Sequence, residues 1–127
     1  MGCNLWFIHH NVIRGLKCRH RAGGLVSINH PFLYSVPTGT WLFDWEHQDS
    51  IEVWDGPWDP TDEQSLATWH SLLVEGKRFT GIGGNDAHKV PDVTALPTTV
   101  VLSKKLSEAA IIDGVRNHNV YIVRDTG

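Results

Sequence analysis

Short apolar runs alternate along this chain with polar loops and amphipathic segments. Runs rich in β-branched residues predict strands, and apolar side chains that recur every three to four residues predict helices. The expected strands cover residues 25–29, 50–54, 79–84, 98–102 and 120–123, and the expected helices start near residues 12, 61 and 107. This order of elements predicts an α/β fold with a largely parallel sheet.

The second and third helices carry local boundary signals. Thr61 and Gln64 have the spacing of a capping box, and Ser107 is the expected N-cap of the last helix. Leu106 and Ile111 are placed to form a hydrophobic staple around that cap. The apolar stripe of the second helix is expected to consist of Leu66, Trp69, Leu72 and Leu73.

Composition narrows the functional classes only slightly. The net charge of −3 and the pI near 6.2 argue against a non-specific nucleic-acid binder. No apolar run approaches the ~20 residues that span a bilayer, and no secretory signal is recognised, so we expect a cytoplasmic protein that does not bind membranes. One basic cluster is expected to be the solvated face of a helix; it consists of Arg14, Lys17, Arg19 and Arg21.

Metal-capable side chains follow three of the expected strands. His30 follows residues 25–29, Asp55 follows residues 50–54, and Asp86 and His88 follow residues 79–84. In parallel α/β sheets the reaction centre lies just beyond the carboxyl ends of the strands. We therefore predict that His30, Asp86 and His88 share one metal site.

Simpler interpretations exist for each of these residues. Asp86 could cap a turn with His88 exposed, and His30 could be a partly buried histidine with a satisfied hydrogen bond. The proline that follows His30 is expected to hold it in extended backbone. Glu52 could support the ligands, bind the ion itself, or be an exposed strand residue, and Asp55 is most simply a turn residue. Four tryptophans could line a pocket or could pack; they are Trp41, Trp45, Trp54 and Trp58.

Three blocks of the chain resemble the PHP (polymerase and histidinol phosphatase) superfamily, and most closely its CehA/McbA-like metallohydrolase branch. They are residues 23–31 (GGLVSINHP), 51–54 (IEVW) and 83–88 (GGNDAH). The resemblance implies a distorted (β/α)7 barrel and a hydrolase of phosphoesters in small molecules. It also implies divalent metal ions, for which zinc, manganese and iron are all suitable.

The same resemblance assigns roles to individual residues. His30, Asp86 and His88 match metal ligands of the family, and Asp86 and His88 are the expected catalytic residues. Glu52 and Asn85 are expected to support the ligands, with Asn85 standing where the family usually has serine.

The resemblance covers only the C-terminal half of a PHP domain. We expect residues 22–127 to form that part, while residues 1–21 have an uncertain relation to the fold. The family ligands that precede the His-Pro block have no counterpart here, so we expect the chain to be a fragment with little or no activity by itself. Unpaired sheet edges are expected to favour self-association. The alternatives are a non-catalytic metal-binding remnant and an aromatic-rich ligand-binding module.

Overall fold

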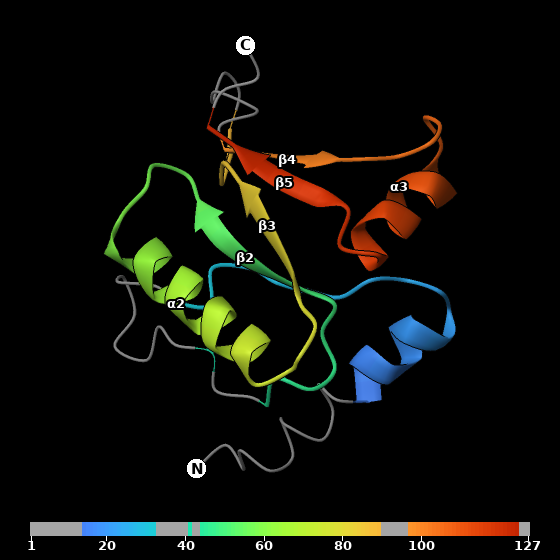
Figure 1. Cartoon of the computed structure of the whole chain (residues 1–127), viewed down its shortest axis with the longest axis horizontal. Coiled ribbons are helices and arrows are strands. Elements are labelled where there is room, and N and C mark those ends of the chain that lie inside the picture. Colours follow the sequence, from blue (N-terminus) through green and yellow to red (C-terminus); the bar gives the residue numbers. More distant parts are fainter. Residues whose placement is uncertain (1–13, 33–40, 42–43, 90–96, 125–127) are drawn as a thin grey trace.

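The computed structural model of the chain describes residues 14–32, 41, 44–89 and 97–124. The elements follow one another as a helix that includes residues 14–21 and then β1, β2, α2, β3, β4, α3 and β5. α2 lies along one side of β2, and the pair β4–β5 with α3 lies on the other side of β3 (Figure 1). The strands and helices expected from the sequence are therefore present in the expected order.

Two small sheets replace the single sheet that the element order predicted. β1 (Ser27–Ile28), β2 (Ser50–Asp55) and β3 (Thr80–Gly84) pair in parallel in the order β1-β2-β3. β4 (Thr98–Val101) and β5 (Val120–Val123) form a separate antiparallel pair. The fold is thus mixed α/β, and the described residues close no barrel.

A threonine side chain joins the two sheets where backbone pairing would have continued a single sheet. The backbone N–H of Gly83 donates to Oγ1 of Thr99 at 2.8 Å, and the same hydroxyl donates to the carbonyl of Gly83 at 2.8 Å. A Cβ on Gly83 would lie 2.9 Å from a methyl group of Ile122. The second sheet therefore packs against β3 through side chains, which explains why the parallel order ends there.

The N-cap of α2 (Pro60–Val74) lies two residues earlier than the sequence predicted. Its N-cap is Asp59, whose carboxylate accepts the backbone N–H of Thr61 at 2.7 Å. Asp62 completes the capping box by accepting the N–H of Asp59 at 2.8 Å. The expected box of Thr61 and Gln64 is wrong because Pro60 occupies the first helical position, where its missing N–H costs nothing.

The buried face of α2 keeps part of the predicted stripe, because Leu72 is buried and Trp69 packs against the core. Leu66 and Leu73 are 36% and 38% exposed, whereas the buried residues of α2 are Asp62, Ser65 and Leu72. Asp62 fixes this orientation, because its carboxylate also accepts the backbone N–H of Asp55 at the end of β2. A polar anchor outweighs the apolar pattern here.

The hydrophobic core lies between α2 and the parallel sheet. Trp69 reaches into it from α2 and donates its indole N–H to the carbonyl of Phe79 at 2.9 Å. A Cβ on Gly81 would lie 3.2 Å from this indole, so the glycine lets the ring pack on β3. The core cluster consists of Ile51, Val53, Leu72 and Phe79, with Trp45, Trp69 and Ile122 packed against it.

α3 (Glu108–Arg116) has the predicted N-cap, Ser107, which accepts the N–H of Ala110. The expected staple is wrong, because Leu106 is 95% exposed. At the other end His118 adopts a left-handed backbone with φ of 61°. Its ring nitrogen Nδ1 lies 2.7 Å from Oγ1 of Thr80, which ties the end of α3 to the start of β3.

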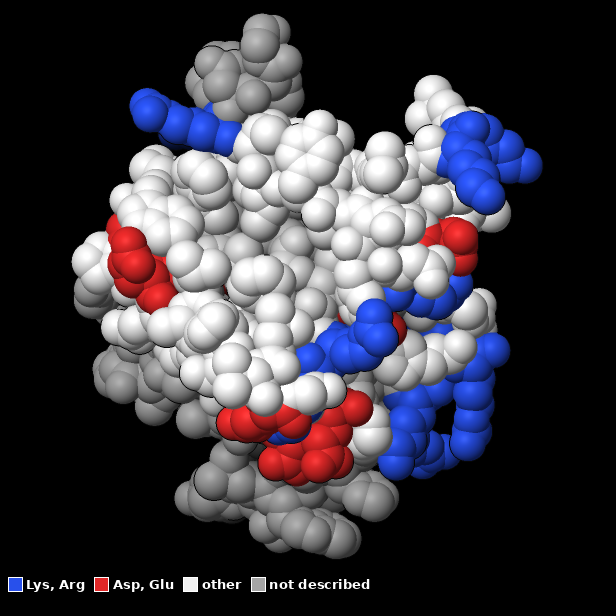
Figure 2. Space-filling model, in the orientation of Figure 1, with Lys and Arg blue, Asp and Glu red and all other residues white. Residues whose placement is uncertain are grey.

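The helix that includes residues 14–21 carries exposed basic side chains, which gather on the face shown in Figure 2. His20 of this helix contacts the carboxylate of Asp49 at 2.8 Å, and Arg116 donates to the carbonyl of Gly23. Cys18 is an exposed free thiol, while Cys3 lies outside the described residues. Among the described helices none is long and apolar enough to cross a bilayer.

Candidate functional site

The carboxyl ends of β1, β2 and β3 lie at one edge of the parallel sheet. His30 follows β1, Asp55 ends β2, and Asp86 and His88 follow β3. Parallel pairing therefore places these four side chains at the edge that the sequence predicted. Residues 90–96, which come next in the chain, lie outside the described residues.

A hydrogen bond links the first two strand ends. The backbone N–H of His30 donates to Oε2 of Glu52 at 2.8 Å. His30 has φ of 34°, so the expected extended conformation is wrong. A left-handed residue other than glycine costs about 1–3 kcal/mol and persists only where its surroundings hold it. The contact with Glu52 provides such a constraint.

Glu52 and Asp55 form the acidic part of this edge. Burial is the largest cause that raises the pKa of Glu52, and the nearby carboxylates of Asp55 and Asp86 raise it further. Burial also raises the pKa of Asp55, with a further contribution from Asp86. His30 acts in the opposite direction on both pKa values. These four groups are therefore close enough to interact electrostatically.

Of the three interpretations of Glu52 left open by the sequence, the exposed strand residue is excluded because Glu52 is buried. Only 7% of its surface is accessible. Asp55, which the sequence suggested was merely a turn residue, belongs to the same acidic group. The signal that could have revealed Asp55 was its position at the very end of a strand next to two predicted ligand ends.

Asp86 and His88 face each other at the end of β3. Nε2 of His88 lies 2.9 Å from Oδ1 of Asp86, and their side chains are 79% and 50% exposed, respectively. Two ligands at about 2.0–2.1 Å from one ion and at right angles to each other would be about 2.9 Å apart. The separation thus suits an ion pair and equally suits two neighbouring ligands of one ion.

The donor chemistry of this edge fits a divalent cation, since imidazole nitrogens and carboxylate oxygens are ordinary ligands of zinc, manganese and iron. Among the described residues, however, no group of three or more His, Cys, Asp or Glu side chains already has the arrangement of a metal site. His30, Asp86 and His88 are the residues that would hold the ion. Asn85 is half-buried between Gly84 and Asp86.

The tryptophans beside this edge are used in packing. Trp54 donates its indole N–H to the carbonyl of Gly56 at 2.9 Å, and Trp58 donates to Oε1 of Glu63 at 2.9 Å. The two rings meet edge to face with centroids 5.2 Å apart. These contacts brace the loop between β2 and α2 and favour the packing interpretation for both residues.

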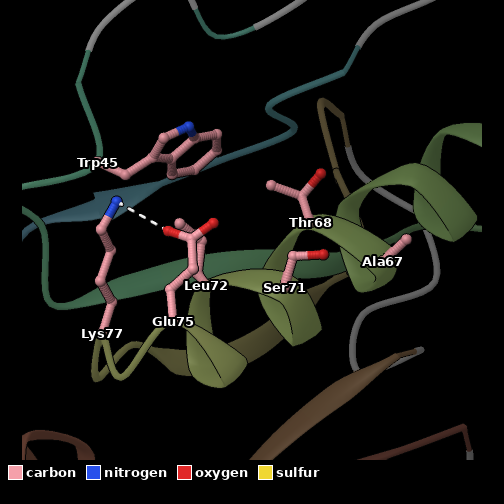
Figure 3. A pocket seen from close by; sticks show the side chains of 7 residues that line it. All are labelled: Trp45, Ala67, Thr68, Ser71, Leu72, Glu75 and Lys77. Atoms are coloured by element: carbon pink, nitrogen blue, oxygen red, sulfur yellow. Dashed lines mark ion pairs between the residues drawn. The ribbon is translucent and has the colours of Figure 1, made fainter.

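A hollow of about 380 Å³ lies against α2, away from the strand edge. Trp45 borders it on one side, and Glu75 and Lys77 form an ion pair at 3.4 Å on the other (Figure 3). Thr68 and Ser71 contribute hydroxyl groups to its lining. None of the residues lining this hollow is a predicted metal ligand.

Comparisons of the chain with models of protein families, with curated proteins and with solved structures give no match. The resemblance to the PHP superfamily therefore stays a prediction from the sequence blocks.

Proposed function

We propose that this chain carries part of the active site of a metal-dependent hydrolase of the PHP type, acting on phosphoesters or related esters of small molecules. The observation that supports the proposal is the gathering of His30, Asp86 and His88 with two further carboxylates at one edge of a parallel sheet. Sites in such sheets form at this edge. The three sequence blocks that resemble the family include the carboxyl ends of β1, β2 and β3 or end beside them.

The residues of this chain would divide the work at that edge. His30, Asp86 and His88 would hold a divalent cation, with Nε2 of His88 and Oδ1 of Asp86, 2.9 Å apart, as neighbouring ligands. A cation bound there supplies a Lewis acid and lowers the pKa of its water towards about 7. Glu52 and Asp55 would add negative charge that favours cation binding.

The test uses the purified chain with manganese, zinc or iron and two chromogenic substrates, a phosphodiester and a phosphomonoester. We expect metal binding that Asp86→Ala and His88→Ala abolish, with turnover below about 1 s⁻¹, the lower end of the ordinary enzyme range. His70→Ala is the matched control, because His70 is exposed on α2. Equal losses of binding in the three variants would show that these histidines and Asp86 affect stability rather than a metal site.

The hollow beside Trp45 supports a second candidate, an aromatic-lined site for a polar small molecule such as a sugar. An indole ring with nearby hydroxyl groups and an ion pair is a suitable lining for such a ligand. Quenching of tryptophan fluorescence by a panel of monosaccharides, unchanged by chelators and lost in Trp45→Ala, would favour this candidate over the metal-dependent hydrolase.

A further inference from the structure

The strained backbone at His30 and the buried carboxylate of Glu52 are two sides of one contact. His30 is left-handed with φ of 34°, and the residue after it, Pro31, has no N–H to contribute to a turn. The hydrogen bond from the His30 N–H to Glu52, at 2.8 Å, spans 22 positions of the sequence. It therefore fixes the end of β1 to the middle of β2.

Gly84 leaves the space in which the carboxylate of Glu52 sits. A Cβ on Gly84 would lie 2.9 Å from Oε1 of Glu52, closer than a carbon normally approaches a carboxylate oxygen. Gly84 is the last residue of β3, and its carbonyl accepts the N–H of Gly56 in the turn after β2. One oxygen of Glu52 thus contacts the end of β1, and the other faces the end of β3.

We infer that Glu52 is a positioning residue, which holds His30 in its left-handed conformation at the end of β1, with Gly84 providing the room. The inference rests on the proposed function in one respect, that the imidazole of His30 binds the ion. Groups that hold metal ligands in place typically change metal affinity by about 10–100-fold when they are removed. The contact itself can be measured without any metal.

Metal affinity is measured by calorimetric titration of the whole chain with manganese chloride, an ion that the exposed thiol of Cys18 binds poorly. Glu52→Ala should weaken binding by about 10–100-fold. Glu52→Gln should lose clearly less affinity than Glu52→Ala, because its amide oxygen can still accept the His30 N–H and only the negative charge is removed. In a His30→Ala background, Glu52→Ala should cause a much smaller loss than in the wild type, because only the contribution of its charge is left to lose.

Two results with the Glu52 variants would overturn the inference. One is that Glu52→Gln loses as much affinity as Glu52→Ala. The other is that Glu52→Ala costs the same in the His30→Ala background, which would make Glu52 a ligand in its own right. Gly84→Ala provides a second route if Glu52→Ala does not fold, because its methyl group displaces the carboxylate while leaving it in the chain. It should lower affinity in the same direction as Glu52→Ala, and unchanged affinity would contradict the inference.

Amide hydrogen exchange of the metal-free protein separates this inference from the proposed function. The His30 amide should exchange slowly in the wild type and in Glu52→Gln, and at least about tenfold faster in Glu52→Ala, where it loses its acceptor. If the wild type binds no manganese, the proposed function fails while the exchange rates still decide whether Glu52 holds His30. Equal exchange rates in the wild type and Glu52→Ala would overturn the positioning role.

Discussion

The hydroxyl of Thr99 forms the two hydrogen bonds to Gly83 that the backbone of a neighbouring strand would otherwise form. The substitution Thr99→Val tests how much these bonds contribute to stability. Thr99→Val keeps the β-branched shape and removes both the donor and the acceptor that satisfy Gly83. Each hydrogen bond contributes about 0.5–1.5 kcal/mol, so the pair contributes about 2 kcal/mol. Because water can reach the half-buried Gly83 only in part, the loss could rise to about 3 kcal/mol.

Thr99→Ser is the matched control, since it keeps the hydroxyl and removes one methyl group. A fully buried methylene contributes about 0.8 kcal/mol, and Thr99 is only half-buried, so the serine variant should lose about 0.4 kcal/mol. The free energy of unfolding is measured by urea titration with far-ultraviolet circular dichroism. The slope of that titration should be the same in all three proteins, which would show that they expose the same surface on unfolding.

A valine variant no more than about 0.5 kcal/mol less stable than the serine variant would contradict this role of the hydroxyl, because a difference of that size is within the usual effect of a surface substitution. Such a result would mean that the two sheets are held together by apolar contacts, such as that of Ile122 with Gly83, and not by the hydroxyl. It would also mean that the position of the end of β3, just before Gly84 and Asp86, does not depend on a hydrogen bond to the second sheet.

Three further predictions concern stability. Gly114→Ala should destabilise the protein by about 1–3 kcal/mol, because the new Cβ would meet a methyl group of Val101. Gly15→Ala, where the new Cβ meets open space, should stabilise it by up to about 1 kcal/mol, and urea titration measures both changes. His118→Ala should lower the melting temperature, because it removes the contact with Thr80, and should leave manganese affinity unchanged. Burial raises the pKa of Glu52, so the contribution of this residue to stability is present in acid and is lost as the pH rises through the folded-state pKa. The melting temperature of Glu52→Gln minus that of the metal-free wild type should therefore be largest at neutral pH and should shrink on acidification. A difference that grows in acid would contradict this prediction.

The sequence predicted the existence and order of the elements well, because those depend on local patterns. The strand expected at 50–54 is β2 (Ser50–Asp55), and the strand expected at 79–84 is β3 (Thr80–Gly84). The predicted N-cap Ser107 is confirmed, because its hydroxyl accepts a backbone N–H of the first helical turn, which is a local interaction. Placement of the predicted ligands at strand ends followed from the same strand boundaries.

The errors arose where a distant polar contact outweighed a local pattern. Asp62 caps α2 and also accepts the N–H of Asp55, so it turns the helix until Leu66 and Leu73 are partly exposed, while Trp69 and Leu72 of the predicted stripe stay packed on the core. His30 is left-handed rather than extended because Glu52, far away in the sequence, accepts its N–H. Neither partner could be identified from spacing, since only the folded sheet brings them together.

The strand edge is the part of this fold that packing alone does not explain. Glu52 is a buried carboxylate whose described partner is a neutral backbone N–H, and its acidic neighbours Asp55 and Asp86 make ionisation more costly. A glutamine could accept the same hydrogen bond without that cost. A cation bound at the edge would offset the repulsion among the three carboxylates, because opposite charges at short range stabilise the ionised forms. A bound cation would therefore lower the cost of ionising Glu52, which the glutamine variant does not have. We predict that manganese raises the melting temperature of the wild type more than that of Glu52→Gln.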